Sequence, residues 1–430
     1  MIKKSLLNFF LILFVCFSSL QAQDTVRVMQ YNLLYYGYNI FDCNATSNNV
    51  NKKNAALREI IDYVKPDIFT VNEISKYVSF HDQILDSVLN INGVSCFARA
   101  GLTNFSNTVI LNQLYYNTDK FGLKNQYALL GGDRDINVYK LYYKSPDLVW
   151  SGDTVFITIF VAHLATSNNS VGQANRDNEA AIVMNHIATL PNPHNYLFQG
   201  DFNMYSGSEP GFQRLINNSN ANIRFHDPIN KVGEWSVNST YAAYHTQSTH
   251  TSGDCFIGGG LDDRFDFILA SLPIIMETQG VKYVPGSYTT LGQDGLHFNK
   301  ALIDSPTNNS APANIIQALY NMSDHLPVYL DLKINQTPAG VEYIAGQSFG
   351  VTFNNPVFDE CVLNIKTQAD GNFRISLFDI TGRCVRNTNV DVFGGSAQIT
   401  LDLSSLSAGL YFLNVSSVRQ QSVSFRLIKL

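Results

Sequence analysis

The stretch Pro66-Asp67-Ile68-Phe69-Thr70-Val71-Asn72-Glu73 joins a run of strand-forming residues to a polar end. The residues from 67 to 71 favour a strand, and the run is too apolar to leave one face in water. A strand of this kind belongs inside a layered sheet. Open α/β sheets bind their ligands at the carboxyl ends of strands, so the position of Glu73 directly after the run also predicts a functional site.

The same texture extends from Asp24 to about Asn335, where apolar runs alternate with amphipathic helical stretches. The other predicted strands are Val26 to Tyr31, Val155 to Ala162, Tyr196 to Gln199, Phe265 to Ala270 and Val328 to Leu332. The predicted helices are Leu57 to Val64 before Pro66, Ala180 to Ile187 before Pro191, and a short one near Phe212 to Ile216. Polar loops are expected from about Ser206 to Leu261. This alternation of strands and helices predicts an α/β domain.

Length and charge exclude several classes of protein. The chain has 430 residues, more than one domain of common size, and its 45% hydrophobic content excludes a disordered chain. The formal net charge is −6, and no basic stretch predicts a general electrostatic grip on nucleic acid. A phosphate-bearing partner must therefore be held by local charges or by a metal ion.

The first 23 residues predict a signal peptide. Lys3 and Lys4 precede an apolar run from Leu6 to about Leu20, and small and polar residues follow around Ala22. Asn8 interrupts the run, which is shorter than the roughly 18 to 20 residues of a spanning helix. We therefore expect an exported protein whose mature chain has no transmembrane segment.

The cysteines that remain after the signal peptide are odd in number, namely Cys43, Cys96, Cys255, Cys361 and Cys384. At least one of them must be free or intermolecular. Cys361 and Cys384 lie in the same C-terminal module and are candidates for a bridge. None of the five has zinc-like spacing.

The texture changes after Leu332. Residues 336–349 are predicted to be a linker, and 350–430 consist of strand-like segments. Ala397, Ile399, Leu401 and Leu403 alternate with polar residues, and this period of two predicts a small antiparallel β-sandwich. The predicted domains are thus 24–335 and 350–430.

Polar side chains stand at the ends of most predicted strands of the first domain. They are Asn32, Glu73, His163, Asp201 and Asn203 in Gly200-Asp201-Phe202-Asn203, Asp266, and Asp324 with His325. Taken singly, each also fits a turn, a strand cap or a hydrogen-bonded interior histidine. Asp266 fits a structural role least well, because a carboxylate between Phe265 and Phe267 needs a partner, such as a histidine, to offset its desolvation.

Taken together, these residues in this order resemble the endonuclease/exonuclease/phosphatase superfamily. The group contains pancreatic-type deoxyribonucleases, repair nucleases, neutral sphingomyelinases and inositol-polyphosphate phosphatases. The resemblance covers roughly residues 25 to 333, and its most specific pieces are Tyr31-Asn32, Pro66 to Glu73, Ala162-His163-Leu164, Gly200 to Asn203, Arg264 to Phe267 and Ser323 to Val328. It implies a four-layer sandwich with two central mixed β-sheets flanked by helices.

The resemblance further implies a metal-assisted attack of water on a phosphoric ester. Glu73 is the hard oxygen ligand that Mg²⁺ or Mn²⁺ prefers, with Asn32 and Asp324 as expected helpers. Asp201 is expected to orient or deprotonate the water, and Asn203 to hold the water or a phosphate oxygen. One metal ion or two, including an additional Ca²⁺, are compatible with the sequence.

The two histidines are expected to contact the phosphate. Asp266 would fix His325, whose imidazole stabilises the charge that develops on the phosphoryl oxygens. His163 is the second histidine, and the sequence leaves open which of the two donates a proton. The carboxylate that supports the first histidine in pancreatic-type nucleases is absent from Val109 to Tyr116, so the support of His163 is in question.

Two further features bear on the substrate. Leu34 stands where abasic-site repair enzymes have an aspartate, which argues against DNA repair, as does export. Arg134 and Tyr139 are predicted either to line the substrate groove or to lie on a solvated strand edge.

The C-terminal module resembles the type A sorting domain of the type IX secretion system of Bacteroidetes. Three segments carry the likeness, which are Arg374 to Arg383, Leu406 to Phe412 and the terminal Lys429. Phe353 to Val357 departs by one residue from the usual Pro-Asn-Pro core. The resemblance implies an immunoglobulin-like sandwich, passage through the type IX machinery, and a secreted or cell-surface location. A carbohydrate-binding or spacer sandwich is the alternative.

The sequence therefore predicts a secreted, metal-dependent hydrolase of phosphoric esters, and an extracellular nuclease acting on DNA or RNA in particular. A phospholipid or sphingomyelin phosphodiesterase, or another phosphatase of the superfamily, is the alternative among enzymes. A surface-binding protein on an inactive nuclease fold is the alternative of another class.

Overall fold

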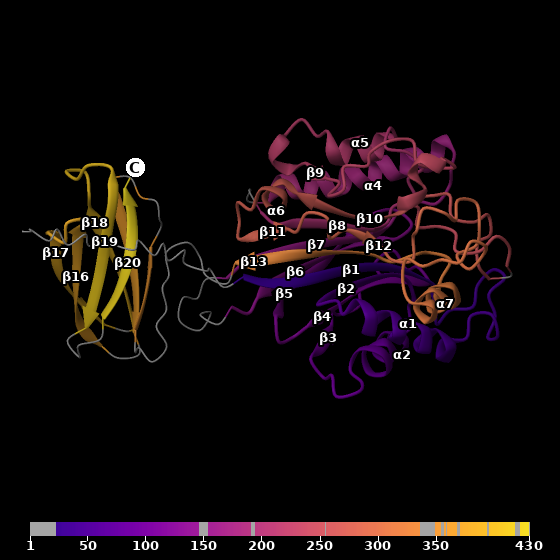
Figure 1. Cartoon of the computed structure of the whole chain (residues 1–430), viewed down its shortest axis with the longest axis horizontal. Coiled ribbons are helices and arrows are strands. Elements are labelled where there is room, and N and C mark those ends of the chain that lie inside the picture. The colour runs from indigo at the N-terminus through magenta and orange to yellow at the C-terminus, as the bar shows by residue number, and fades with distance from the viewer. Residues whose placement is uncertain are drawn as a thin grey trace, which may run out of the picture.

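The computed structural model describes residues 23–145, 154–190, 194–253, 255–335, 349–353, 357, 359–367, 370–393, 395–417 and 422–429. The predicted signal peptide, apart from Gln23, and the predicted linker, apart from Phe349, lie outside the described residues. So does Pro191, which was predicted to end the second helix. Figure 1 shows the arrangement of the helices and strands.

The first central sheet has seven strands. In chain order they are β1 (Gln23–Tyr36), β2 (Ile68–Ser75), β3 (Phe97–Arg99), β4 (Ile110–Asn117), β11 (Val281–Tyr283), β12 (Thr289–Thr290) and β13 (Val328–Asn335). Their spatial order is β11-β13-β1-β2-β4-β3, with β12 paired to β13. Strands β1 and β2 run parallel, while β1 and β13 are antiparallel. The sheet is therefore mixed.

The second central sheet has six strands. They are β5 (Phe121–Leu130), β6 (Asp135–Tyr143), β7 (Phe156–His163), β8 (Tyr196–Asp201), β9 (Phe225–His226) and β10 (Asp266–Ser271). Their spatial order is β5-β6-β7-β8-β10-β9. Strands β7 and β8 are parallel and β10 is antiparallel to β8, so this sheet is also mixed.

Helices cover the outer face of each sheet. They are α1 (Val50–Val64), α2 (Val78–Ile84) with a π-helical turn at Leu85–Leu89, α4 (Ser170–Thr189), α5 (Pro210–Ile216) and α7 (Ala313–Met322). The short helix α6 (Leu272–Met276) instead contributes Ile274 to the core between the sheets. Asn49 caps α1 by accepting from the backbone of Lys52, and the helix ends at Lys65 in a left-handed conformation before Pro66. In Figure 1, α4 and α5 lie on one side of the sheets and α1, α2 and α7 on the other.

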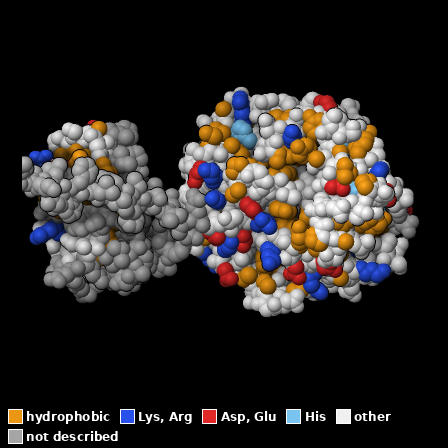
Figure 2. All heavy atoms as spheres, viewed as in Figure 1, with side chains coloured by type: hydrophobic (Ala, Val, Ile, Leu, Met, Phe, Trp, Pro, Cys, Tyr) orange, Lys and Arg blue, Asp and Glu red, His pale blue; other side chains and the backbone are white. Residues whose placement is uncertain are grey.

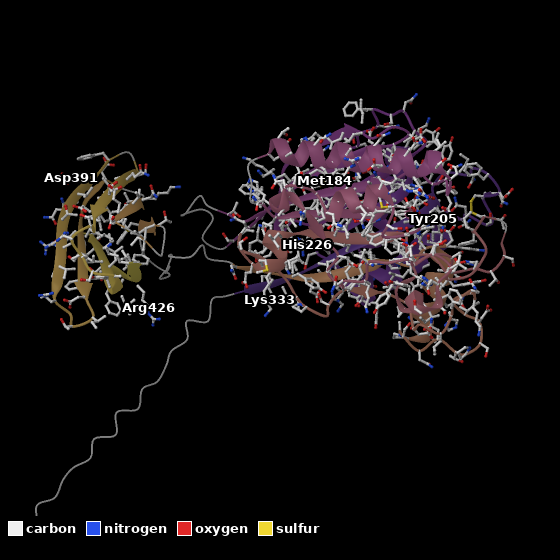
Figure 3. All side chains as sticks on the ribbon, turned by 90° about the horizontal axis from the view of Figure 1, so that it is seen from above. Met184, Tyr205, His226, Lys333, Asp391 and Arg426 are labelled. Atoms are coloured by element: carbon white, nitrogen blue, oxygen red, sulfur yellow. A yellow bond between two sulfur atoms is a disulfide. The ribbon has the colours of Figure 1, made fainter. Side chains whose placement is uncertain are left out.

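Three apolar cores separate these four layers. The middle core joins the two sheets and includes Val28, Ile159 and Ile268. One outer core packs α1 and α7 on the first sheet, and the other packs α4 and α5 on the second, where Met184 of α4, labelled in Figure 3, lies. Each fully buried side chain of this kind stabilises the fold by about 1.5 to 3 kcal/mol. The four-layer fold class predicted from the sequence is confirmed.

A disulfide joins Cys43, in the loop after β1, to Cys255, in the loop before β10. The sequence did not single out this pair. The suggested bridge between Cys361 and Cys384 is wrong, because both cysteines are free. Cys361 is buried in β15 and Cys384 is exposed on β17, in different sheets.

The C-terminal region contains two further sheets, both antiparallel in the described residues. One comprises β14 (Phe349–Phe353), β15 (Glu360–Thr367) and β18 (Ser396–Asp402), and the other β16 (Gly371–Asp379), β17 (Cys384–Val392), β19 (Gly409–Ser417) and β20 (Ser422–Lys429). Leu363 of the first sheet and Leu377 of the second share one apolar core. The predicted small β-sandwich is confirmed. Asp391 and Arg426 mark its strands in Figure 3.

Membrane-spanning helices were also sought among the described residues. None of the helices there is both long enough and apolar enough to cross a bilayer.

Candidate active site

Strand register brings the polar strand ends of both sheets together. In the first sheet, Asn32, in the C-terminal half of β1 just before its register shifts, pairs with Asn72 of β2. In the second, Asp201 of β8 pairs with His163 of β7 on one side and with Asp266 of β10 on the other. Because β1 with β2, and β7 with β8, run parallel, their carboxyl ends meet at one edge of the sandwich. Figure 3 shows Tyr205, which follows β8, at the opposite end of the domain from Lys333 of β13.

Irregular backbone aims Glu73 into this edge. The register of β1 against β2 shifts between Asn32 and Tyr36, and that of β2 against β4 shifts between Val71 and Ile74. Glu73 itself has φ of 57°. Bulges of this kind redirect side chains and occur often beside active sites. The backbone N–H of Tyr35 donates to Glu73 Oε2 at 3.1 Å, which fixes the carboxylate.

Gly200 allows the second sheet to deliver its two catalytic candidates side by side. The residue has φ of 143°, and a Cβ atom there would lie 1.8 Å from the carbonyl oxygen of Ala162. Only glycine permits this approach of β8 to β7. The approach sets Asp201 beside His163.

The centre of the site is a compact cluster of buried polar side chains. Asn32 Nδ2 donates to Asp201 Oδ2 at 2.9 Å and to Glu73 Oε1 at 3.2 Å. His163 Nε2 lies 3.6 Å from Asp201 Oδ2 and 3.7 Å from Glu73 Oε1. Ligand atoms of Glu73, His163 and Asp201 all lie within 4.8 Å of one another. Such a group can hold a metal ion.

Burial sets the protonation of this cluster. It raises the pKa of Glu73, with the charge of Asp324 adding to the effect, and it raises the pKa of Asp201 to about 7. Burial, followed by the positive charge of Arg134, lowers the pKa of His163 well below its ordinary value. His163 is therefore neutral, and the two carboxylates lack a full counter-charge from it. A cation at this point would favour the ionised form of both acids.

His325 forms the charged pair that the position of Asp266 requires. Its Nδ1 lies 2.7 Å from Asp266 Oδ2, and both side chains are buried. Burial opposes the imidazolium, but the charges of Asp266 and Asp201 outweigh it and raise the pKa of His325 well above the ordinary value. Nε2 of the ring lies 3.6 Å from Asp201 Oδ2 and 2.9 Å from the carboxamide nitrogen of Gln247. The ring thus carries its charge toward the cluster.

Asn203 and Asp324 lie beside the same cluster. The Asn203 backbone N–H donates to Asp201 Oδ1 at 3.1 Å, and its side chain donates to the carbonyl of Leu164. Asp324 Oδ2 accepts from the backbone of Ile257 at 3.1 Å. All eight residues that the sequence placed at the centre or at the metal are buried; they are Asn32, Glu73, His163, Asp201, Asn203, Asp266, Asp324 and His325.

The two residues predicted for the substrate groove have different positions. Arg134 is partly buried before β6, where Nη1 donates to the carbonyl of Leu164 at 3.4 Å. Tyr139 is only 1% exposed and belongs to the apolar core between the sheets. Strand β6 lies between β5 and β7, so it is no edge. Neither of the positions predicted for Tyr139, groove or solvated edge, fits this location.

Several residues that support the site carried no strong signal in the sequence. Asn72 accepts from the backbone of Asp201 at 2.9 Å and donates to Asn112 at 2.7 Å, so it ties the two sheets together. Lys53 Nζ donates to the carbonyls of Leu33 and Leu34 and is fully buried. Gln247 reaches His325 from a loop, where no periodicity identifies it. Of these three residues, only Asn72 could have been identified from the sequence, because it lies directly before Glu73 in a buried strand.

The sequence offers no carboxylate to support His163, and the structure shows what surrounds the ring instead. Among the described residues, no group hydrogen bonds to His163 Nδ1, which is buried. Asn112, a polar residue of the stretch from Val109 to Tyr116, contacts Asn72 and Asn137 instead. The ring is therefore positioned by packing and by the two acids.

The donor set fits a divalent metal ion. Carboxylate oxygens of Glu73 and Asp201 are the hard ligands of Mg²⁺. Asn32 turns Nδ2 toward these acids, while its Oδ1 accepts from the backbone N–H of Leu34 at 2.9 Å, so it orients them. A neutral imidazole beside them also suits Mn²⁺. The acids have no Lys or Arg in an ion pair among the described residues, which leaves their charge for such an ion.

Comparison with known families identifies the C-terminal region. Residues 352–429 match the model of the "Secretion system C-terminal sorting domain". The sequence resemblance is confirmed for this module. The match covers the two small sheets apart from the first three residues of β14, and it carries with it the expectation of export through a secretion system.

Solved structures similar to the chain come from the family that the first domain resembles. An endonuclease/exonuclease/phosphatase family protein from Bacteroides thetaiotaomicron is 12% identical with a TM-score of 0.45, over 73% of this chain and 96% of that one. A D. rerio TDP2 in complex with a single-strand DNA product is 12% identical with a TM-score of 0.45, over 72% and 98%. A mannosyl-6-phosphatase from B. thetaiotaomicron is 14% identical with a TM-score of 0.44, over 71% and 99%. No curated protein matches the sequence.

Proposed function

We propose that residues 24–335 form a metal-dependent phosphoesterase that hydrolyses phosphodiesters, and that its substrate is nucleic acid outside the cell. One observation carries this proposal: Glu73, Asp201, Asn32 and His163 converge at one sheet edge beside the charged His325–Asp266 pair. A purely binding surface needs neither two buried acids nor a charged histidine fixed by a third. These groups have the chemistry that ester hydrolysis requires.

The metal ion would be held by Glu73, with Asp324 close by. Asn32, predicted as a helper at the metal, would act by orienting Glu73 and Asp201 through Nδ2, because its Oδ1 accepts from the backbone of Leu34. When bound, the ion would supply positive charge to a phosphoryl oxygen. Glu73 suits this role because its carboxylate is fixed by the backbone of Tyr35 and by Asn32. A ligand held in this way needs little reorganisation when the ion binds.

The remaining side chains either accept and donate protons or stabilise charge on the phosphate. Asp201 accepts the proton of the attacking water, and Asn203, which is bonded to Asp201, holds that water or a phosphate oxygen. His325 donates from Nε2 to the phosphoryl oxygens and offsets their growing charge. His163, which is neutral, lies on the same two acids and is available to the leaving oxygen. Arg134, whose charge is felt at His163, adds positive charge for the substrate phosphate.

The test is a panel of DNA, RNA, sphingomyelin and a bis-aryl phosphate, with Mg²⁺, with Mn²⁺ and with a chelator. Metal-borne charge contributes several kcal/mol at the transition state, so we expect removal of the metal to slow turnover by a factor on the order of 10² or more. Turnover that resists the chelator would overturn the mechanism. Cleavage of sphingomyelin but not of nucleic acid would replace the substrate class and keep the mechanism.

Export is the second part of the proposal. We expect residues 350–430 to direct passage through the type IX system and to contribute nothing to hydrolysis, because they form separate sheets with their own core. A chain that ends at Asn335 should keep the turnover of the full chain when purified, yet accumulate in the periplasm of its host. Loss of activity in the folded, purified truncation would show that the module belongs to the enzyme.

A further inference from the structure

A pair of aromatic rings lies next to the catalytic cluster and has no role in the mechanism above. The ring of Phe41 is 80% exposed, and its centroid lies 5.7 Å from that of Tyr35, at an angle of 52°. A single exposed aromatic residue is ordinary on a protein surface. Phe41 differs because it lies against Tyr35, and the backbone N–H of Tyr35 donates directly to Glu73 Oε2. The two rings, here called the Tyr35–Phe41 platform, thus adjoin the centre of the site.

The Tyr35 side of the platform is supported from below. Tyr35 packs on a small apolar cluster made of Leu34 and the disulfide between Cys43 and Cys255. Leu34, Tyr35 and Phe41 all have positive φ, a conformation that non-glycine residues keep only when their surroundings enforce it. Such strained and fixed residues are typical of binding sites. A ligand that stacks here would lose little binding free energy to ordering the protein.

The surroundings of Phe41 discriminate between possible occupants. Its neighbours Asn39, Asp42 and Asn44 are exposed, so the ring stands among polar groups and one carboxylate. A bilayer would have to take these groups into its interface along with the ring, which is unfavourable. An unpaired nucleobase offers a flat face for the ring and polar edges for the groups around it.

Charge favours a single strand over a duplex. The chain carries a net charge of −6, and on the face shown in Figure 2 positive and negative side chains are mixed. A duplex is gripped mainly through many phosphates, each needing a positive partner. Stacking of a base on an aromatic ring contributes about 1 to 3 kcal/mol without any charge. A single strand, held by one stacked base and by Arg134 at its phosphate, therefore suits this surface better than a duplex does.

We infer that the Tyr35–Phe41 platform stacks an unpaired nucleobase of the substrate next to the phosphate at the catalytic cluster, so that the enzyme prefers single-stranded nucleic acid. The inference rests on the proposed function. It names the substrate class and assigns two specificity-determining residues, Tyr35 and Phe41.

The experiment compares two single-stranded substrates of equal length and charge, pentathymidylate and its abasic counterpart. For the full chain with Mg²⁺, we expect kcat/KM to be about 5 to 140 times higher for the base-bearing strand, the factor that one stacked base provides. Phe41→Ala should reduce this ratio to near one, mainly through KM. Phe41→Trp, which restores a flat ring, should recover it. Phe393→Ala, at a residue 70% exposed in the C-terminal module, is the matched control and should leave the ratio at its wild-type value.

The outcomes separate this inference from the proposed function. Hydrolysis of both strands with no base preference, or a ratio that Phe41→Ala leaves intact, would overturn the platform and spare the enzyme. Equal losses on both strands in Phe41→Ala and Phe41→Trp would assign the ring a structural role and also overturn it. No hydrolysis of any phosphodiester would refute the proposed function itself. Binding of sphingomyelin vesicles that Phe41→Ala abolishes would assign the rings to lipid and reject the nucleobase.

Discussion

Replacing Asp201 with asparagine is expected to lower kcat by a factor on the order of 10² to 10⁴, the usual effect of losing a general base. Asparagine keeps the shape of the side chain. Asp201 accepts from Asn32 at 2.9 Å and from the backbone of Asn203 at 3.1 Å through separate oxygens, and the single oxygen of asparagine can keep one of these two bonds. Asparagine cannot accept the proton of the attacking water. The fold and the substrate affinity should therefore change little while turnover collapses.

A metal titration gives this prediction its sharpest test, because Asp201 also belongs to the cluster that can hold an ion. Glu73→Gln is the matched variant. It removes the charge of the proposed ligand, so part of its lost rate should return at high Mg²⁺ or with Mn²⁺. Steady-state kinetics of both variants across the titration decides the roles. If metal rescues Asp201→Asn as well, Asp201 is a ligand and another group must be the base.

The buried strands of the fold could be predicted because each is a continuous apolar run. Such runs predicted six strands, and the polar residues at or near their ends mark the site. In the structure these strands are β1, β2, β7, β8, β10 and β13. Strand β5 escaped prediction, since the polar residues Lys124, Asn125 and Gln126 interrupt it, the first two with exposed side chains. Strand β6 was not among the predicted strands either, and Tyr139 in it was placed in a substrate groove or on a solvated edge, although β5 and β7 flank the strand. A local pattern carries no information about which strand pairs beside it.

The residues that touch the reacting groups were easier to predict than those that position them. Glu73 and Asp201 follow strands, whereas Gln247 and Lys53 reach the site from a loop and a helix. The disulfide between Cys43 and Cys255 closes a separation of 212 residues. Such contacts depend on tertiary packing alone, so neither spacing nor residue type could identify them.

The same bridge explains how two loops act together at the site. Cys43 follows Tyr35, whose backbone holds Glu73, and Cys255 precedes Ile257, whose backbone holds Asp324. The disulfide therefore links the support of an acid in the first sheet to the support of the acid beside His325. It also suits an exported protein, because disulfides persist in oxidising compartments.

Replacing His325 with alanine is expected to lower kcat by a factor on the order of 10² to 10³, the usual effect of removing one donor from a developing oxyanion. KM should rise less, because the growing charge exists only in the transition state. The variant also leaves Asp266 buried without its partner, which costs stability. His297→Ala is the matched control, since His297 is another fully buried histidine bonded to an aspartate, Asp294, at 2.8 Å. It should lose stability in the same way and keep kcat.

Asp266→Asn tests whether His325 acts through its charge. The carboxylate of Asp266 outweighs burial and helps to raise the pKa of His325, so the wild-type imidazole stays charged through neutral pH. A group with a raised pKa is charged below that pKa and loses its proton as pH rises. Removing the carboxylate lowers the pKa, so the variant should lose kcat as pH rises through neutrality, where the wild type retains it. A kcat profile across pH measures the shift. A variant with a lower kcat but an unshifted alkaline limb would show that Asp266 only orients the ring and that the charge of His325 does not drive the reaction.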